Sequence, residues 1–254
     1  MFSKAIMFAV GCSALTFGCG ADLSDETQEI QDNLVQAGFP ANDIMVVDGV
    51  VYVGRDAVVT LEASREMLET DSSQEQFRTT NLVSRTLTNI CVNGAAFTGS
   101  FSTALNNAIA NYNALGLTFR MTRTTGGTAG CGATITARVV SGNGGSAGFP
   151  SGGRPFNTIN IGSSLRQFST ATIEHVITHE LGHTVGFRHS DFFNRSISCG
   201  GAAQNEGQAG VGAILIAGTP SGAQVGGSLM NSCFRQNESG NFTGSDVTAL
   251  QNLY

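Results

Sequence analysis

Apolar and polar positions alternate in ways that divide the first third of the chain into short elements. Apolar residues at helical spacing predict a helix, which a Gly-Phe-Pro sequence ends. Two β-branched runs around an Asp-Gly pair predict a hairpin. A strand that extends this sheet and a short helix are expected to follow. In chain order these elements cover residues 23–37, 44–53, 57–61 and 62–68.

The remaining two thirds show a second series of strands and helices, interrupted by a glycine-rich stretch at 141–153. That stretch lacks a phosphate-loop pattern, so it predicts structural turns or, alternatively, a loop stabilised by Ca2+. The longer helix at 101–115 is predicted to be capped by Ser100 or Ser102, and the helix at 170–185 by Ser169. Strands are predicted over residues 85–92, 117–122, 133–140 and 158–162.

The chain has 254 residues, of which 41% are hydrophobic, enough for one large domain or two modest ones. Its net charge of -6 is unevenly distributed. Residues 21–75 hold 13 acidic residues and 2 arginines, whereas residues 76–254 hold 6 acidic residues and 10 arginines. The arginines are dispersed and not interleaved with aromatic residues, which argues against nucleic-acid binding. The acidic segment has apolar periodicity, so we expect it to fold.

The N-terminus, residues 1–19, has the pattern of an export signal. Lys4 precedes an apolar stretch too short to span a membrane comfortably. The sequence around Cys19 resembles a bacterial lipobox, although Leu15 lies one place too early. Two outcomes stay open: a lipidated Cys19 attaches the protein to a membrane surface, or cleavage near Gly20 releases it. Either outcome predicts a secreted or extracytoplasmic protein.

Three histidines and a glutamate have the spacing of a catalytic zinc site. His179 and His183 stand one helical turn apart and can bind one metal ion, with Glu180 between them. Gly186 lies where a helix end commonly needs a left-handed residue, and the reversal returns His189 to the metal. Three protein ligands leave a fourth position open for water, which is the catalytic arrangement.

The other histidine of the chain and the cysteines do not change this assignment. The set of three ligands is complete without His175, which we expect to support the site or to be exposed. A structural zinc site would normally be closed by a fourth Cys or His, and none lies at a suitable spacing.

The pattern HExxHxxGxxH and the downstream sequence SLMN at 228–231 resemble the metzincin metallopeptidases. The sequence HELGHTVGFRHSD is most similar to the bacterial dual-action HEIGH metallopeptidases, with Leu181 in place of isoleucine. Ser232 stands where astacins and serralysins have a tyrosine, so no tyrosine ligand is carried over. The final segment, 245–254, resembles the last helix of the matrixin branch.

This resemblance implies an α+β, metzincin-like catalytic domain: a twisted mixed sheet with an active-site helix and a C-terminal helix, preceded by a small α/β prosegment. Met230 would lie under the metal as an apolar cushion, and the strand at 158–162 would be the sheet edge that lines the cleft. Glu180 would be the general base that takes a proton from a zinc-bound water. Asp191 is interpreted as a partner that orients an imidazole or as a capping or solvated aspartate.

Four cysteines remain once the two in the N-terminal segment are set aside, and an even number in an exported protein indicates disulfides. A second metal site of cysteines is disfavoured because no CxxC spacing occurs. The favoured pairing would tie the loop after the third histidine to the methionine turn and brace the zinc site. The favoured pairs are Cys91 with Cys131 and Cys199 with Cys233.

Residues 20–76, which are rich in acidic side chains, are interpreted as a prosegment and linker. They would cover the catalytic domain, residues 77–254, until the polar stretch at 70–76 is cut. This segment has no cysteine beyond Cys19 to bind the zinc, and an unspecified acidic residue is the alternative.

The predicted function is that of a zinc-dependent endopeptidase acting on protein or peptide substrates. An exopeptidase, or a non-catalytic peptide-binding or adhesion module with structural zinc, are the alternatives. The sequence sets no oligomeric state.

Overall fold

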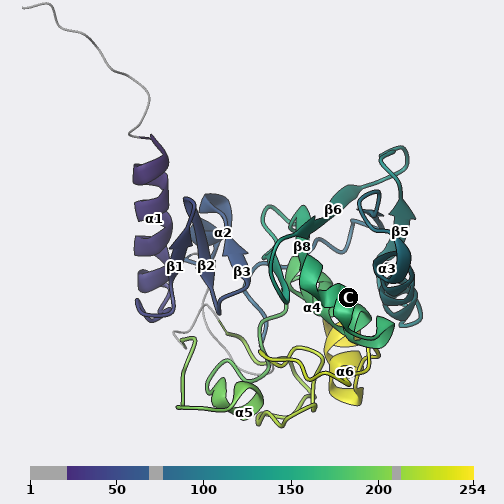
Figure 1. The fold of residues 1–254 in the computed structure, drawn as a ribbon. Helices are drawn as coiled ribbons and strands as arrows, with labels where there is room; N and C mark the ends of the chain where they lie inside the picture. Colours follow the sequence, from purple (N-terminus) through teal and green to yellow (C-terminus); the bar gives the residue numbers. More distant parts are fainter. Residues whose placement is uncertain (1–21, 69–76, 208–212) are drawn as a thin grey trace, which may run out of the picture.

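The computed structural model describes residues 22–68, 77–207 and 213–254. Within these residues an eight-stranded mixed sheet with packed helices confirms the predicted α+β fold class. The strands lie in the order β1-β2-β3-β7-β8-β6-β4-β5 (Figure 1). The predicted signal segment, 1–19, and the predicted linker, 70–76, lie outside the described residues.

The N-terminal unit, residues 22–68, has the predicted order of helix, hairpin, strand and helix. Asp48 and Gly49 both have positive φ (51° and 78°), as a two-residue hairpin turn requires. The buried apolar side chains of this unit form a core of their own, to which Phe149 also contributes. The elements are α1 (Asp22–Gln36), β1 (Met45–Val47), β2 (Val50–Val53), β3 (Ala57–Val59) and α2 (Leu61–Glu66).

The C-terminal part, residues 77–254, supplies the other five strands. β4 pairs in parallel with β5 and β6, and β6 pairs in parallel with β8. β7 pairs antiparallel with β8 on one side and parallel with β3 on the other, so one sheet runs through both parts. The strands are β4 (Asn89–Asn93), β5 (Arg120–Thr124), β6 (Ala133–Val140), β7 (Gly145–Gly148) and β8 (Thr158–Gly162).

Two sequence predictions about this sheet are wrong. The strand at 158–162 is not an edge, because β8 lies between β7 and β6. The glycine-rich stretch at 141–153 is not all turns, because β7 forms inside it. Small residues disguise this strand in the sequence, yet the structure requires them. A Cβ on Gly148 would lie 2.6 Å from the carbonyl oxygen of Val58 on β3.

Two long helices, α3 (Gly99–Asn113) and α4 (Thr170–Thr184), pack against each other, and α4 also contacts β7 and β8. The Ser169 hydroxyl caps α4 as predicted, accepting from the Thr172 amide at 3.1 Å. The predicted capping of α3 by Ser100 or Ser102 is wrong. Both serines lie inside the helix, and Thr98 has the extended backbone of the cap position.

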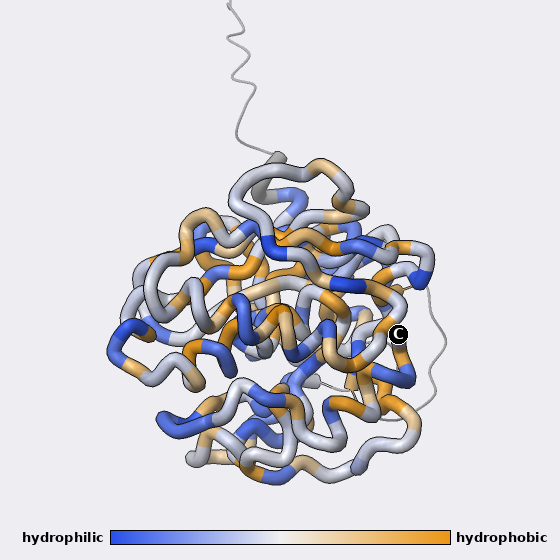
Figure 2. The backbone as a smooth tube through the Cα atoms, turned by 90° about the vertical axis from the view of Figure 1, so that its right-hand side faces the viewer, coloured by the Kyte–Doolittle hydropathy of each residue, from blue (hydrophilic) through white to orange (hydrophobic). Residues whose placement is uncertain are grey.

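Along the backbone, many hydrophobic positions lie in the interior, and many hydrophilic positions lie on the outer loops (Figure 2). The larger core spans the C-terminal part and includes side chains of α3, α4 and α6 (Gly244–Leu253). Both favoured disulfides are present, Cys91 with Cys131 and Cys199 with Cys233. None of the described helices has the length and apolar character that crossing a membrane requires.

Candidate metal centre and active site

The three predicted histidines converge at the C-terminal half of α4. His179 and His183 project from one face of this helix, and the loop that follows returns His189 to the same point. The Nε2 atoms of His179 and His189 lie 3.3 Å apart. All three imidazoles are buried, with exposed fractions of 6%, 1% and 2% in chain order. The structure therefore brings together the ligand set that the sequence predicted.

Each of these imidazoles is held by its other ring nitrogen, Nδ1. The Nδ1 of His179 lies 3.0 Å from the Leu229 carbonyl oxygen, and that of His183 lies 2.8 Å from the Phe187 carbonyl oxygen. A carbonyl oxygen can only accept, so Nδ1 carries the proton and Nε2 presents a lone pair. At this distance two facing lone pairs need a proton or a metal ion between them. This is the outer support that metal-binding histidines usually have.

A fourth side chain reaches this point from the N-terminal unit. Asp56, in the β2–β3 connection, places its carboxylate 3.2 Å from Nε2 of His189, 3.8 Å from that of His183 and 3.9 Å from that of His179. Ligand atoms of all four residues lie within 4.8 Å of one another. No other group of three or more such side chains occurs in residues 22–68, 77–207 and 213–254, so calcium binding near 141–153 stays a prediction.

The four side chains fit a tetrahedral zinc ion. Metal–ligand bonds of about 2.0–2.1 Å place neighbouring ligand atoms about 3.4 Å apart, close to the distances found here. His183 Nε2 and Asp56 Oδ1 are buried with no hydrogen-bond partner. Buried polar atoms are rarely left so, because the loss of hydration is costly unless a partner or an ion replaces the water.

Burial lowers the pKa of His179 well below its usual value and that of His183 to about 4, so both imidazoles are neutral near pH 7. Burial would also lower the pKa of His189, but the carboxylates of Asp56 and Glu206 outweigh it and raise that pKa. A negative charge beside three imidazoles favours a cation at this centre.

The Glu180 carboxylate lies beside the three histidines and not among the metal-binding group. It is 2% exposed, and its Oε2 has no hydrogen-bond partner. Burial, followed by the nearby Asp56 carboxylate, raises its pKa well above the usual value. Gly145 of β7 lies against it so closely that a Cβ there would collide with the carboxylate. The group is thus free to accept a proton, in a place where β7 tolerates only glycine.

Gly186 and Met230 lie around the end of α4, and the place of Met230 under a metal ion stays a prediction. Gly186 has φ of 106°, and a Cβ there would lie 2.8 Å from the Asn81 carbonyl oxygen, so the reversal toward His189 requires glycine. Met230 is buried beneath α4, where a Cβ on Gly182 would lie 2.6 Å from the methionine sulfur. The methionine packs against the helix that carries two of the ligands.

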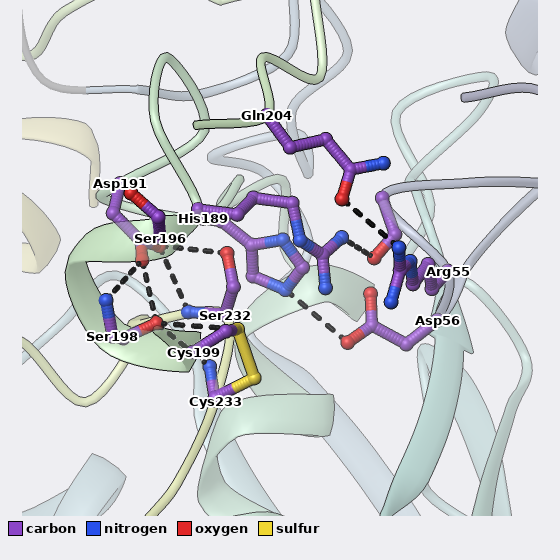
Figure 3. The surroundings of a disulfide bond; sticks show 12 residues. Arg55, Asp56, His189, Asp191, Ser196, Ser198, Cys199, Gln204, Ser232 and Cys233 are labelled. Atoms are coloured by element: carbon purple, nitrogen blue, oxygen red, sulfur yellow. Dashed lines mark hydrogen bonds and ion pairs between the residues drawn. A yellow bond between two sulfur atoms is a disulfide. The ribbon is translucent and has the colours of Figure 1, made fainter. Parts of the chain in front are cut away.

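Asp191 does not orient an imidazole. Its two carboxylate oxygens accept hydrogen bonds from the hydroxyls of Ser198 (2.6 Å) and Ser232 (2.7 Å), beside the Cys199–Cys233 disulfide (Figure 3). Asp191 thereby ties the loop after His189 to the segment after Met230. Asp191 is fully buried, so its interpretation as a solvated aspartate is wrong, and its Oδ2 also accepts from the Ser198 amide at 3.3 Å.

The carboxylate that orients His189 is Glu206, which sequence reasoning missed. Its Oε1 lies 2.7 Å from His189 Nδ1 and 2.9 Å from the Arg195 guanidinium, and the group is 1% exposed. Glu206 follows the third histidine by 17 residues in an irregular segment, where no periodicity indicates burial. The signal available in the sequence was that acidic residues are scarce in this part, since residues 76–254 contain 6 of them and Glu206 is one.

His175, one turn before His179, stays outside the metal-binding group, and its Nδ1 lies 2.9 Å from the Ser239 carbonyl oxygen. It helps to line a cavity of about 200 Å³ beside the metal centre. Glu180, Phe234 and Arg55 also line this cavity, which is large enough for one side chain of a bound peptide. Phe234, which follows the methionine turn in the sequence, is therefore part of the wall of this cavity.

Comparison with known proteins agrees with this chemistry. A search among curated proteins finds no match. Two solved structures of myroilysin are similar to this chain at 12% and 11% identity, with TM-scores of 0.38 and 0.34. They cover 67% and 63% of this chain and 93% and 80% of their own. The model of the dual-action HEIGH metallo-peptidases matches residues 51–254. The chain therefore belongs to the dual-action HEIGH metallopeptidase family.

Proposed function

We propose that this protein is an exported, metzincin-type zinc endopeptidase in which His179, His183 and His189 hold the metal and Glu180 is the general base. One observation carries this proposal. Three imidazoles have their Nδ1 atoms fixed and their Nε2 atoms converging, and a buried carboxylate without a hydrogen-bond partner lies beside them. A structural site would have no chemical use for that carboxylate.

Zinc bound here would supply a Lewis acid that brings the pKa of water near 7 and stabilises negative charge on an oxygen. Glu180 would accept the proton of the attacking water and later deliver it to the leaving amine. The raised pKa of its carboxyl fits a group that holds this proton between the two steps. Met230 and Glu206 would keep the imidazoles in place and would not touch the substrate.

An endopeptidase needs a site that accepts the middle of a chain. The cavity beside Glu180 is lined by Val176, Asn231 and Phe234, and no arginine of the C-terminal part lines it. A carboxypeptidase would need a cation there to bind the terminal carboxylate. This lining favours protein or peptide substrates that enter by an internal residue, with one side chain in this cavity.

Export is supported by the covalent structure. Two disulfides in a chain of this size are typical of oxidising compartments outside the cytoplasm. We propose that residues 1–19 direct export and that Cys19 either is lipidated or is removed by cleavage near Gly20. Cys19 and Gly20 lie outside the described residues. Mass spectrometry of the exported protein distinguishes lipidation from cleavage.

The test is a comparison of the protein with Glu180→Ala at matched zinc content, on unfolded casein, before and after limited proteolysis. We expect one zinc per chain in both and hydrolysis by the parent alone, with a rate loss of about 10²–10⁴-fold in the variant. Hydrolysis by Glu180→Ala at the parent rate would remove the general-base role. Zinc binding without hydrolysis in any sample would favour the peptide-binding module.

A further inference from the structure

We propose that the connection and strand at residues 54–59 form a built-in inhibitor, in which Asp56 supplies the fourth ligand of the metal and β3 covers the strand that a substrate would pair with. The inference rests on the proposed peptidase function. It makes the intact chain a latent form, and it names the acidic group that the sequence alone left unspecified.

Among the described residues, the side-chain carboxylate of Asp56 contacts no charged or hydrogen-bonding side chain other than the three imidazoles. Its Oδ1 is buried without a hydrogen-bond partner, and its other contacts are with the three imidazoles. The neighbouring cation, Arg55, points elsewhere and donates to Gln204 Oε1 at 2.9 Å (Figure 3). A buried carboxylate costs stability unless a cation compensates it. A metal ion bound jointly by Asp56 and the three histidines supplies that compensation. The Asp56 carboxylate then occupies the coordination position that a catalytic water needs.

The backbone forms a tight turn immediately before Asp56, and this turn directs the Asp56 carboxylate toward the three histidines. Gly54 and Arg55 both have positive φ, 60° and 76°, a conformation that is unfavourable for a residue with a side chain such as Arg55. The turn is held from both parts of the molecule. The Gly54 amide donates to Asp43 Oδ2 at 3.0 Å, and the Gly54 carbonyl oxygen accepts from the Arg195 guanidinium. Arg195 also pairs with the carboxylate that orients His189, so the turn is docked onto the metal centre's own support.

The same segment covers the strand nearest the catalytic carboxylate. β3 pairs in parallel with β7, with Ala57 opposite Ala147, and the Ala147 amide donates to the Asp56 carbonyl oxygen at 3.0 Å. β7 begins at Gly145, which lies against Glu180. β8 takes one side of β7 and β3 takes the other side at Ala147 and Gly148, so an extended peptide can pair along the whole of β7 only after β3 leaves. One segment thus closes the metal centre and the peptide-binding edge together.

The N-terminal unit is built as a separable piece. Its apolar side chains form one core, which Phe149 of the C-terminal part also joins, and a second core lies within the C-terminal part. Its surface contacts the C-terminal part through polar and charged groups as well, such as the Gly152 amide on Glu66 at 2.6 Å. The Phe39 ring lies 4.7 Å from the Arg188 guanidinium carbon. The opposite charge balances of the two parts favour docking, since residues 22–68 hold 10 acidic residues and 2 arginines and residues 77–254 hold 6 acidic residues and 10 arginines.

A competing role must be tested in the same experiment, because the family match begins at residue 51 and so includes Asp56. A permanent fourth ligand would be needed for metal binding and activity, whereas an inhibitory ligand is needed for neither. We therefore compare the intact full chain with Asp56→Ala and Asp56→Asn. The control is Asp25→Ala, which removes an exposed carboxylate of the same unit. Mass spectrometry confirms that each chain is uncleaved, and circular dichroism confirms the fold.

The first readout is the visible spectrum of the cobalt-substituted proteins, which reports the ligand set without catalysis. We expect both Asp56 variants to keep one metal per chain and to change this spectrum, while Asp25→Ala matches the parent. The second readout is casein hydrolysis by the uncleaved, zinc-loaded chains, which we expect to rise at least about tenfold in the Asp56 variants.

An unchanged cobalt spectrum, or loss of the metal from both folded variants, would overturn the inference. So would a changed spectrum with hydrolysis still at the parent's low level, provided that limited proteolysis of the same sample releases activity. Failure of the proposed function has a different signature: no sample cleaves casein before or after proteolysis, while the cobalt spectrum still reports whether Asp56 is a ligand.

Discussion

The two parts of this molecule contribute to one metal centre in opposite ways. The C-terminal part supplies three imidazoles, each fixed through Nδ1 by a carbonyl or carboxylate oxygen. The N-terminal unit supplies a single carboxylate, delivered on a strained turn between two strands. A rigid set of ligands and one borrowed ligand indicate that the first part carries the chemistry and that the second controls access to it.

Their packing shows the same difference. The C-terminal part has a large core beneath a five-strand portion of the sheet and two disulfides, one of them beside the metal centre. The N-terminal unit has a small core without a disulfide and joins the sheet through the pairing of β3 with β7. Substitutions that act on one part alone can therefore establish how much each part determines metal binding and access.

The largest expected effect comes from a ligand of the C-terminal part. His183→Ala should lose the zinc and all measurable hydrolysis, because two imidazoles and a borrowed carboxylate cannot replace a complete set. His175→Ala is the matched control, since His175 is also buried on α4 but lies outside the metal-binding group. It should keep one zinc per chain. Atomic absorption on folded protein measures both, and stoichiometric zinc in His183→Ala would contradict the ligand assignment.

A smaller effect is expected when the support of a ligand is changed. Glu206→Gln should weaken zinc binding about 10–100-fold, because the imidazole of His189 loses the charged acceptor that orients it. Asp191→Asn removes a buried charge from the same loop region but contacts serines, so its zinc affinity should match the parent's even if its stability falls. Competition with a zinc chelator gives both affinities. Equal losses in the two variants would reduce Glu206 to a structural role.

Local patterns in the sequence predicted most of the elements and three of the four side chains that could hold a metal ion. The helical spacing of His179 and His183 and the glycine at 186 are constraints within a few residues, and such constraints are visible in one chain. The hairpin around Asp48 and the cap at Ser169 were found for the same reason.

The missed features all depend on contacts between distant segments. Asp56 lies 123 residues before His179, and Glu206 lies in an irregular segment, so neither belongs to a local pattern. The strand β7 was not predicted because glycine has a low strand propensity. Its glycines are required because Glu180 and β3 approach the backbone of β7 closely. The edge at 158–162 was an expectation from the metzincin resemblance, and the pairing of β7 with β8 overturns it.

The smallest expected effect concerns the docking of the N-terminal unit, where the comparison between the two parts is most sensitive. Phe39→Leu keeps an apolar side chain but removes the ring that faces Arg188, which should weaken docking by about 0.5–2 kcal/mol. If β3 and Asp56 inhibit the intact chain, its basal hydrolysis of casein should then rise about two- to thirtyfold. Phe119→Leu is the matched control, because Phe119 is equally buried but packs on Tyr254 in the core of the C-terminal part. That variant should lower thermal stability without raising hydrolysis. An increase in both variants would mean that loosening either core is enough to open the site, and the separate role of the N-terminal unit would be lost.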